Sequence, residues 1–134
     1  DIAAKAGVMM DPDTPKRIPN TLNAHRLIHW AGLEGRQTLM VSALFRAYWV
    51  EGRDSGDLSV LADLAAEAGL NRDGIARLLS TDADLAEIRV REGHARERGI
   101  NAVPTFLLAN QYVLSGAQPP EVWAQVIDEL AARA

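Results

Sequence analysis

Cysteine is absent from all 134 residues of the chain. This absence excludes a disulfide framework, a thiolate metal site and a thiol nucleophile within these residues. Basic residues are also scarce, since 14 Lys and Arg stand against 18 Asp and Glu and give a net charge of −4. Without a positive field to hold a phosphate backbone, nucleic-acid binding is not expected.

Long apolar runs are missing as well. None approaches the roughly 20 residues that span a bilayer, and the first five residues lack the basic and apolar regions of a signal peptide. We therefore expect a cytoplasmic protein with no membrane partner. What is present is a length of 134 residues with 48% hydrophobic composition, enough for one domain with a real core.

Residues 1–19 predict the end of a helix, a short strand and a loop. The segment Asp1–Ala6 is typical of a helix that stops at Gly7, and the apolar run Val8–Met10 is typical of a strand. Prolines at positions 12, 15 and 19 then forbid a helix and favour a connecting loop. Because the first helix begins without a capping residue, we expect that earlier sequence has been lost.

Residues 20–98 show helical periodicity throughout, and glycine-containing breaks divide them into five predicted helices. Asn20, Asp57 and Asn71 are the predicted N-caps of the first, third and fourth helices, and the last begins at Thr81 or Asp82. The side chains that these helices are expected to bury include Leu39, Met40, Ala43, Leu44, Ala47 and Tyr48, then Leu58, Leu61, Leu64 and Ala65, and then Ile75, Leu78 and Leu79.

Residues 99–134 predict a hairpin followed by a helix. The pair Val103-Pro104 precedes an apolar run over 105–108, Asn110 supplies a turn, and residues 112–115 return. Pro119 and Pro120 then open a helix. Its apolar positions are Val122, Trp123, Val126, Ile127 and Leu130.

This order of elements resembles the DsbA-type thiol-disulfide oxidoreductases and their 2-hydroxychromene-2-carboxylate isomerase relatives. The strings Ala-Val-Pro-Thr-Phe at 102–106 and Asn-Thr-Leu-Asn-Ala-His-Arg-Leu at 20–27 carry the resemblance. It implies an α/β fold, thioredoxin-like and of DsbA type, with a large all-helical insertion. The implied segments are a remnant of the N-terminal thioredoxin-fold unit (1–19), the helical insertion (20–98) and the C-terminal hairpin-helix half (99–134).

The resemblance also implies substrate-binding residues. A cis Val103–Pro104 bond would turn the backbone N–H and C=O of Val103 outward, ready to pair with an extended peptide or glutathione; an ordinary trans proline at a strand start is the alternative. Asn20 matches a family residue that approaches the active site, and His25 belongs to the same string, although Asn20 as a plain helix cap fits equally. The family's catalytic cysteine has no counterpart here, so no catalytic residue is expected within this chain.

Three functions remain open. The first is a thiol-disulfide oxidoreductase acting on a protein or small-molecule thiol or disulfide, with its cysteine upstream and no cofactor. The second is a glutathione-dependent isomerase or transferase, although Ala117 and Gln118 stand where such relatives carry an acidic and polar pair. The third is a non-catalytic module that pairs through open strand edges with another chain, including a second copy in a homodimer.

A metal site is not expected. His25 and His29 are four residues apart on a predicted helix, a spacing that can place two ligands on one face. The zinc peptidase pattern, however, needs Glu directly after the first His, and this chain has Arg26, whose fixed positive charge opposes a cation. His94 has no evident partner.

Overall fold

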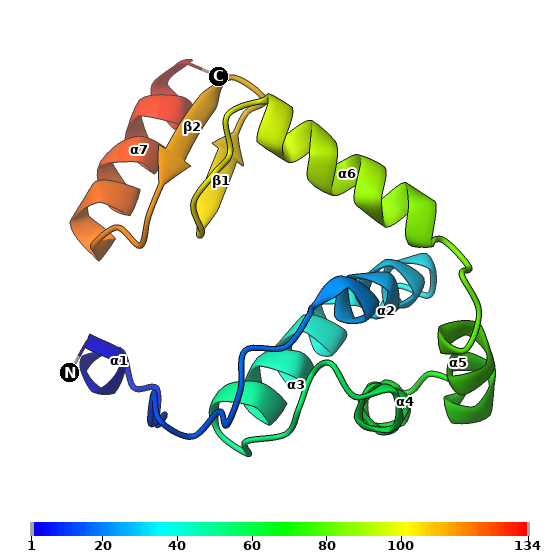
Figure 1. Ribbon diagram of the computed structural model, residues 1–134. Helices are drawn as coiled ribbons and strands as arrows, with labels where there is room; N and C mark the ends of the chain where they lie inside the picture. Colours follow the sequence, from blue (N-terminus) through cyan, green and yellow to red (C-terminus); the bar gives the residue numbers. More distant parts are fainter. Residues whose placement is uncertain (1, 134) are drawn as a thin grey trace. The chain divides into compact units, whose positions relative to one another are not determined.

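The computed structural model describes residues 2–133, and the chain forms two compact units, Asp1–Val90 and Arg91–Ala134. The first unit is helical and contains α1 (Ile2–Lys5), α2 (Leu22–Leu33), α3 (Gln37–Trp49), α4 (Leu58–Glu67), α5 (Arg72–Leu79) and the start of α6 (Leu85–Glu97) (Figure 1). The second unit contains the end of α6, the strands β1 (Thr105–Leu108) and β2 (Tyr112–Ser115), and α7 (Pro120–Arg133). Within residues 2–133 there is no helix with both the length and the apolar character needed to cross a membrane.

The N-terminal segment ends its helix as predicted but forms no strand. Gly7 has φ +75°, and the N–H groups of Gly7 and Val8 donate to the carbonyls of Ala4 and Ala3, the Schellman pattern that closes a helix. The prediction of a strand at Val8–Met10 is wrong, since β1 and β2 pair only with each other in the described part of the chain. A strand needs a hydrogen-bonded neighbour, and these residues have none.

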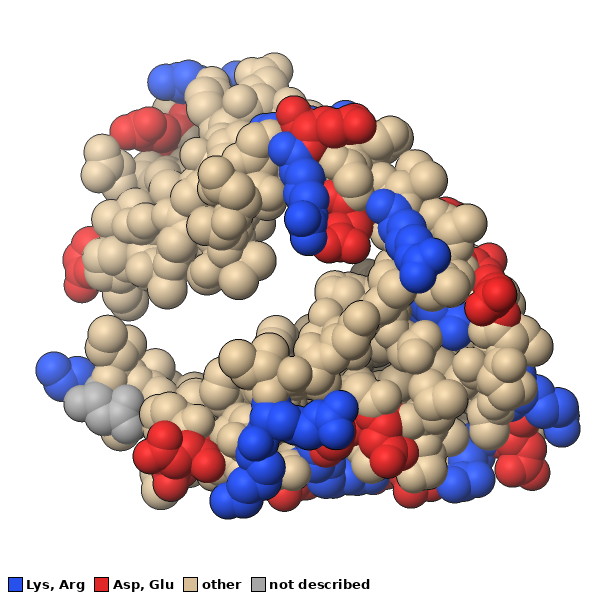
Figure 2. Space-filling model, viewed as in Figure 1, with Lys and Arg blue, Asp and Glu red and all other residues tan. Residues whose placement is uncertain are grey.

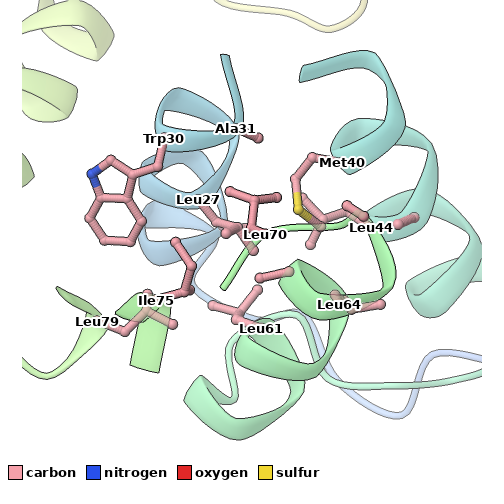
Figure 3. Close-up of a cluster of buried hydrophobic side chains, with 14 of the residues drawn as sticks. Leu27, Trp30, Ala31, Met40, Leu44, Leu61, Leu64, Leu70, Ile75 and Leu79 are labelled. Atoms are coloured by element: carbon pink, nitrogen blue, oxygen red, sulfur yellow. The ribbon is translucent and has the colours of Figure 1, made fainter. Parts of the chain in front are cut away.

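Helices α2 to α5 enclose the core of the first unit. Helix α2 packs against α3 and α4, α3 against α4, and α4 against α5. Their apolar stripes meet in one cluster, which Figure 3 shows with side chains from all four helices converging. Fully or almost fully buried members include Leu27, Ala31, Met40, Ala47, Leu61, Leu64 and Ala65.

Two of the predicted caps are confirmed. The Asp57 carboxylate accepts from the backbone N–H groups of Ser59 and Val60 at 2.8 and 3.2 Å, and the Asn71 side chain accepts from Gly74 N at 2.7 Å. Each cap satisfies backbone donors that an isolated helix start leaves unpaired.

Three predicted core positions are wrong. Leu39, Leu58 and Leu78 are 57, 42 and 39% exposed. Leu39 and Leu78 lie beside the buried positions of their helices, where the spacing alone does not decide which side chain reaches the neighbouring helix. Leu58 is on the buried face of α4 but is its first residue, so it lies at the end of the helix.

Two helix starts also differ from expectation. Helix α2 begins at Leu22 with Thr21 as its cap residue, and the Asn20 side chain accepts from Leu22 N at 3.0 Å instead of capping from the expected position. Helix α6 begins only at Leu85, because residues 81–84 form a turn in which Asp84 has φ +57°.

The second unit is a hairpin with a helix against one face. Strands β1 and β2 are antiparallel, with Thr105 opposite Ser115 and Leu108 opposite Tyr112. The predicted turn at Asn110 is confirmed: Ala109 and Asn110 have φ +49° and +56°, as a tight hairpin turn requires. Helix α7 is fixed by an edge-to-face contact between the rings of Phe106 and Trp123, 4.7 Å apart.

This second unit has little buried surface. Among residues 91–133 no side chain is buried, and the cross-strand pair Leu107 and Val113 is 51 and 62% exposed. Because Phe106 faces α7 and neighbouring strand residues point to opposite faces, Leu107 and Val113 lie on the sheet face away from α7. That face is apolar and uncovered within the unit.

Candidate functional site

The first candidate site surrounds Val103 and Pro104, in the loop before β1. The peptide bond between them is cis, and Val103 is 91% exposed. The carbonyl of Pro104 accepts from Gly116 N at 2.8 Å, and the Thr105 hydroxyl donates to Ala102 O at 2.7 Å. The loop is therefore held on both sides of Val103 while Val103 itself projects outward.

A hollow lies beside this loop. It is lined by Arg96, Ile100, Asn101, Ala102 and Val103 and has a volume of about 520 Å³. Within residues 2–133, no group hydrogen-bonds to the backbone of Val103. The surface over the hairpin and α7 is mostly uncharged on the side shown in Figure 2. An extended segment of another polypeptide can therefore reach an unpaired backbone donor and acceptor here.

Asn20 lines a different, polar cavity in the first unit. This cavity has a volume of about 400 Å³, and its other polar residues include Arg17, Asn23, Arg26, Thr81, Asp82 and Arg89. The Oδ1 atom of Asn20 is used by Leu22 N, which leaves the side-chain amide nitrogen as its donor toward the cavity.

Arg26, which follows His25 in the same sequence string, is 2% exposed and forms the wall of that cavity. Its guanidinium donates to the carbonyls of Leu78, Thr81 and Ala83 at 2.8–2.9 Å and to Asn23 Oδ1 at 2.9 Å. Burial lowers the pKa of Arg26 from its ordinary value, and the nearby Asp82 and Asp84 offset part of that change. Arg26 therefore fixes the turn between α5 and α6.

His25 is exposed and lines a third cavity, which is apolar. The cavity has a volume of about 300 Å³ and is lined mainly by Ile18, Pro19, Ile28, Leu44, Phe45, Tyr48 and Trp49. Tyr48 and Trp49 both reach it, with their rings edge-to-face at 4.9 Å, and the Tyr48 hydroxyl donates to Arg17 O at 3.1 Å. In the sequence, the adjacent aromatic residues Tyr48 and Trp49 indicate a cleft at the end of this helix, but neighbouring helix positions are not expected to share one face, and Phe45 was not included.

The comparisons with known proteins identify the family. A family model described as the DSBA-like thioredoxin domain matches residues 1–128. The chain belongs to the DSBA-like thioredoxin family. This membership confirms the predicted thioredoxin-like fold of DsbA type, which is mostly helical in these residues.

Relatives of this DSBA-like chain are longer than it is. It is 29% identical to the uncharacterized protein YwbO of Bacillus subtilis, over 96% of this chain and 64% of YwbO. The crystal structure of the probable DsbA oxidoreductase SCO1869 from Streptomyces coelicolor matches with a TM-score of 0.88 and 32% identity, over 98% of this chain and 57% of that one. A structure from Nitrosomonas europaea, 18% identical with a TM-score of 0.77, shares the fold. The chain thus spans about 57 to 64% of the first two relatives.

Of the four predicted site residues, two belong to each unit of this DSBA-like chain. Asn20 and His25 are in the first unit and line different cavities, whereas Val103 and Pro104 are in the second unit. His29, which the sequence analysis weighed as a ligand only together with His25, lies with the carboxylates of Asp84 and Glu87.

Proposed function

We propose that the whole protein is a thiol-disulfide oxidoreductase and that this chain holds the polypeptide backbone of its substrate. The observation that carries the proposal is the exposed Val103, whose backbone is unpaired within residues 2–133 and lies beside a hollow, in a chain of the DSBA-like family. These residues contain no cysteine, so the proposal assigns the reactive thiolate to a part of the whole protein outside them.

The reaction needs a thiolate next to a bound disulfide. The thiolate attacks one sulfur of the substrate disulfide, a mixed disulfide forms, and the second substrate sulfur leaves as a thiolate. A second thiolate of the enzyme then attacks the mixed disulfide, which leaves the substrate as a dithiol and the enzyme as a disulfide; the reverse sequence oxidises the substrate. During these steps Val103 N–H and C=O pair with the extended segment that carries the substrate sulfur.

The open face of the hairpin supports this proposal. Leu107 and Val113 form an apolar pair on the sheet face away from α7, and both are more than half exposed. Burying apolar area stabilises a fold by about 25 cal/mol per Å², so an uncovered apolar sheet face favours further packing. We assign that covering to the remainder of the thioredoxin fold, which would bring the cysteine-bearing segment to this half of the domain.

Glutathione-dependent chemistry is the second candidate, and the corner after β2 weakens it. There the Gln118 side-chain nitrogen donates to Ser115 O at 2.8 Å, so this side chain bonds within the corner. Ala117 offers no side-chain polar group. The sequence resemblance implies such groups at this corner in glutathione-using relatives, and this chain presents fewer of them.

The test uses the full-length protein and compares two disulfide substrates. Val103→Pro removes the backbone N–H, and Val103→Ala is the matched control that keeps it. Losing one hydrogen bond of about 0.5–1.5 kcal/mol lowers the rate by roughly twofold to tenfold. We expect Val103→Pro to slow insulin-disulfide reduction by that factor, and to leave the reduction of a small aromatic disulfide without a peptide backbone unchanged.

Other outcomes decide against the proposal. Equal slowing of both substrates would show that the substitution disturbs the thiolate and not backbone pairing, and full insulin activity in Val103→Pro would show that Val103 N–H is not used. Tight glutathione binding by a protein without insulin activity would favour the glutathione-dependent isomerase or transferase instead.

A further inference from the structure

Three potential metal ligands lie close together on the first unit, and none of them belongs to the Val103 loop. His29 lies on α2, Asp84 in the turn before α6, and Glu87 in the first turn of α6. One ligand atom of each lies within 4.8 Å of the other two. They come together because the turn at residues 81–84 brings the start of α6 back to α2.

The chemistry of this set suits a divalent transition metal. One imidazole and two carboxylates supply nitrogen and oxygen ligands, and the two carboxylates bring a charge of −2, which balances a divalent cation. Zinc is held by such His and carboxylate ligands at about 2.0–2.2 Å, and sites with three protein ligands leave a fourth position for water. Two ligands on one tetrahedral ion are then roughly 3.4 Å apart, so the ligand atoms, which lie within 4.8 Å of one another, need to approach by at most about 1.4 Å.

Asp84 is oriented by a buried side chain. Its Oδ2 atom accepts from the indole Nε1–H of Trp30 at 2.7 Å, and Trp30 is 5% exposed. This leaves Oδ1 for a metal. Hydrogen bonds of this kind to ligating carboxylates orient the ligand and support metal affinity.

The backbone that carries Asp84 is held as well. Arg26 donates to the carbonyls of Thr81 and Ala83, on the two sides of Asp82. Its guanidinium also lies 4.9 Å from the centroid of the Trp30 ring. The positive charge of Arg26 opposes a cation, but its donors already face three carbonyls and Asn23, and Asp82 adds a further negative charge nearby.

Access from solvent is open on one side. Asp84 and Glu87 are exposed and His29 is half-buried. An ion can therefore reach the three ligands without unfolding of α2 or α6.

We propose that His29, Asp84 and Glu87 form a metal site that binds one divalent transition-metal ion, with zinc as the probe of choice. The site joins α2 to the start of α6, so binding stabilises the first unit. It is independent of the thiol chemistry proposed above, and its test does not use disulfide exchange.

The experiment titrates Zn²⁺ into the full-length protein, produced without a polyhistidine tag, stripped of metal with a chelator and with its thiols alkylated so that only nitrogen and oxygen ligands remain. Calorimetry is expected to show one equivalent bound at micromolar metal and a higher melting temperature. His29→Gln and Glu87→Gln are expected to lower the affinity at least tenfold. His94→Gln, which replaces an exposed histidine on α6 outside the cluster, is the matched control and should bind as the parent does.

The alternatives have distinct results. The proposal is wrong if the parent binds no zinc, if all three variants bind alike, or if His94→Gln loses the binding. Circular dichroism verifies folding of each variant, and Asp84→Asn replaces any variant that fails to fold. X-ray absorption of the zinc-loaded chain should show one imidazole and otherwise oxygen ligands, with no sulfur.

Discussion

The replacement Arg26→Lys tests how much of the first unit depends on one buried guanidinium. Arg26 is 2% exposed and donates to Leu78 O, Thr81 O and Ala83 O, all within 2.9 Å. Lysine keeps the charge but presents a compact ammonium in place of the planar fork that serves several carbonyls at once.

The magnitude follows from the carbonyls left without a donor. Leu78 O also accepts from the N–H and the hydroxyl of Thr81, so it keeps partners when Arg26 is replaced. At most two backbone carbonyls, those of Thr81 and Ala83, then lose their donor, and an ammonium can serve one of them. The Asn23 side chain also loses its bond to Arg26, but it lines the polar cavity, where water can replace that donor. Hydrogen bonds to charged groups contribute about 1.5–3 kcal/mol each, and a buried ammonium is the more strongly hydrated cation. We therefore expect Arg26→Lys to lower the free energy of unfolding by about 2–4 kcal/mol.

Urea denaturation followed by far-UV circular dichroism measures this free energy. Arg89→Lys is the matched control: it makes the same chemical change at an exposed position on α6, where surface substitutions stay within about 0.5 kcal/mol. A loss below about 0.5 kcal/mol in Arg26→Lys would refute the argument, because it would mean that the turn at 81–84 holds its conformation without the guanidinium.

Two further predictions concern the same unit. Leu64→Ala removes a side chain with 0% exposure from the core and is expected to destabilise by about 2–5 kcal/mol in thermal or urea unfolding, well above Leu78→Ala at a position that is 39% exposed. The pKa of Asp57 is lowered first by the hydrogen bond from the Ser59 hydroxyl and then by those from the N–H groups of Val60 and Ser59. The stabilisation that the ionised Asp57 gives the folded state is therefore fully present above its unfolded pKa near 3.8, and it is lost as the pH falls through the lower folded pKa. Asp57→Asn should therefore flatten the acid side of the stability-pH curve; an unchanged acid side would contradict the cap's role.

Local signals allowed much of the fold to be predicted. The side chains of Asp57 and Asn71 cap their helices by accepting from backbone N–H groups two or three residues further along the chain. Asn110 itself adopts the positive φ that the hairpin turn needs. The strand predicted at Val8–Met10 was wrong because pairing is not local: an apolar run becomes a strand only beside another strand. Hydrophobic periodicity located the helices, but it could not separate Leu64, which is buried, from Leu58, which is exposed.

The candidate sites divide in the same way, into features set by near neighbours in the sequence and features set by residues far away in it. The cis bond before Pro104 was predicted from the string at 102–106 and is present, whereas a substrate-binding role for Val103 stays a prediction. Arg26 was not recognised as buried, because its carbonyl partners lie 52 to 57 residues away in sequence. His29 was weighed only against His25, since the spacing on one helix is visible in a sequence and the approach of Asp84 is not.

Trp30 connects the core to the surface cluster. Its ring is buried among the apolar side chains of the first unit, while its N–H holds the Asp84 carboxylate. A buried indole nitrogen needs an acceptor, because leaving such a donor unpaired costs about 1–3 kcal/mol. Asp84 supplies that acceptor from a backbone with φ +57°, which a non-glycine residue rarely adopts. The position of this carboxylate beside His29 is thus set by the requirements of the core, and a cation that binds there meets a ligand already fixed in place.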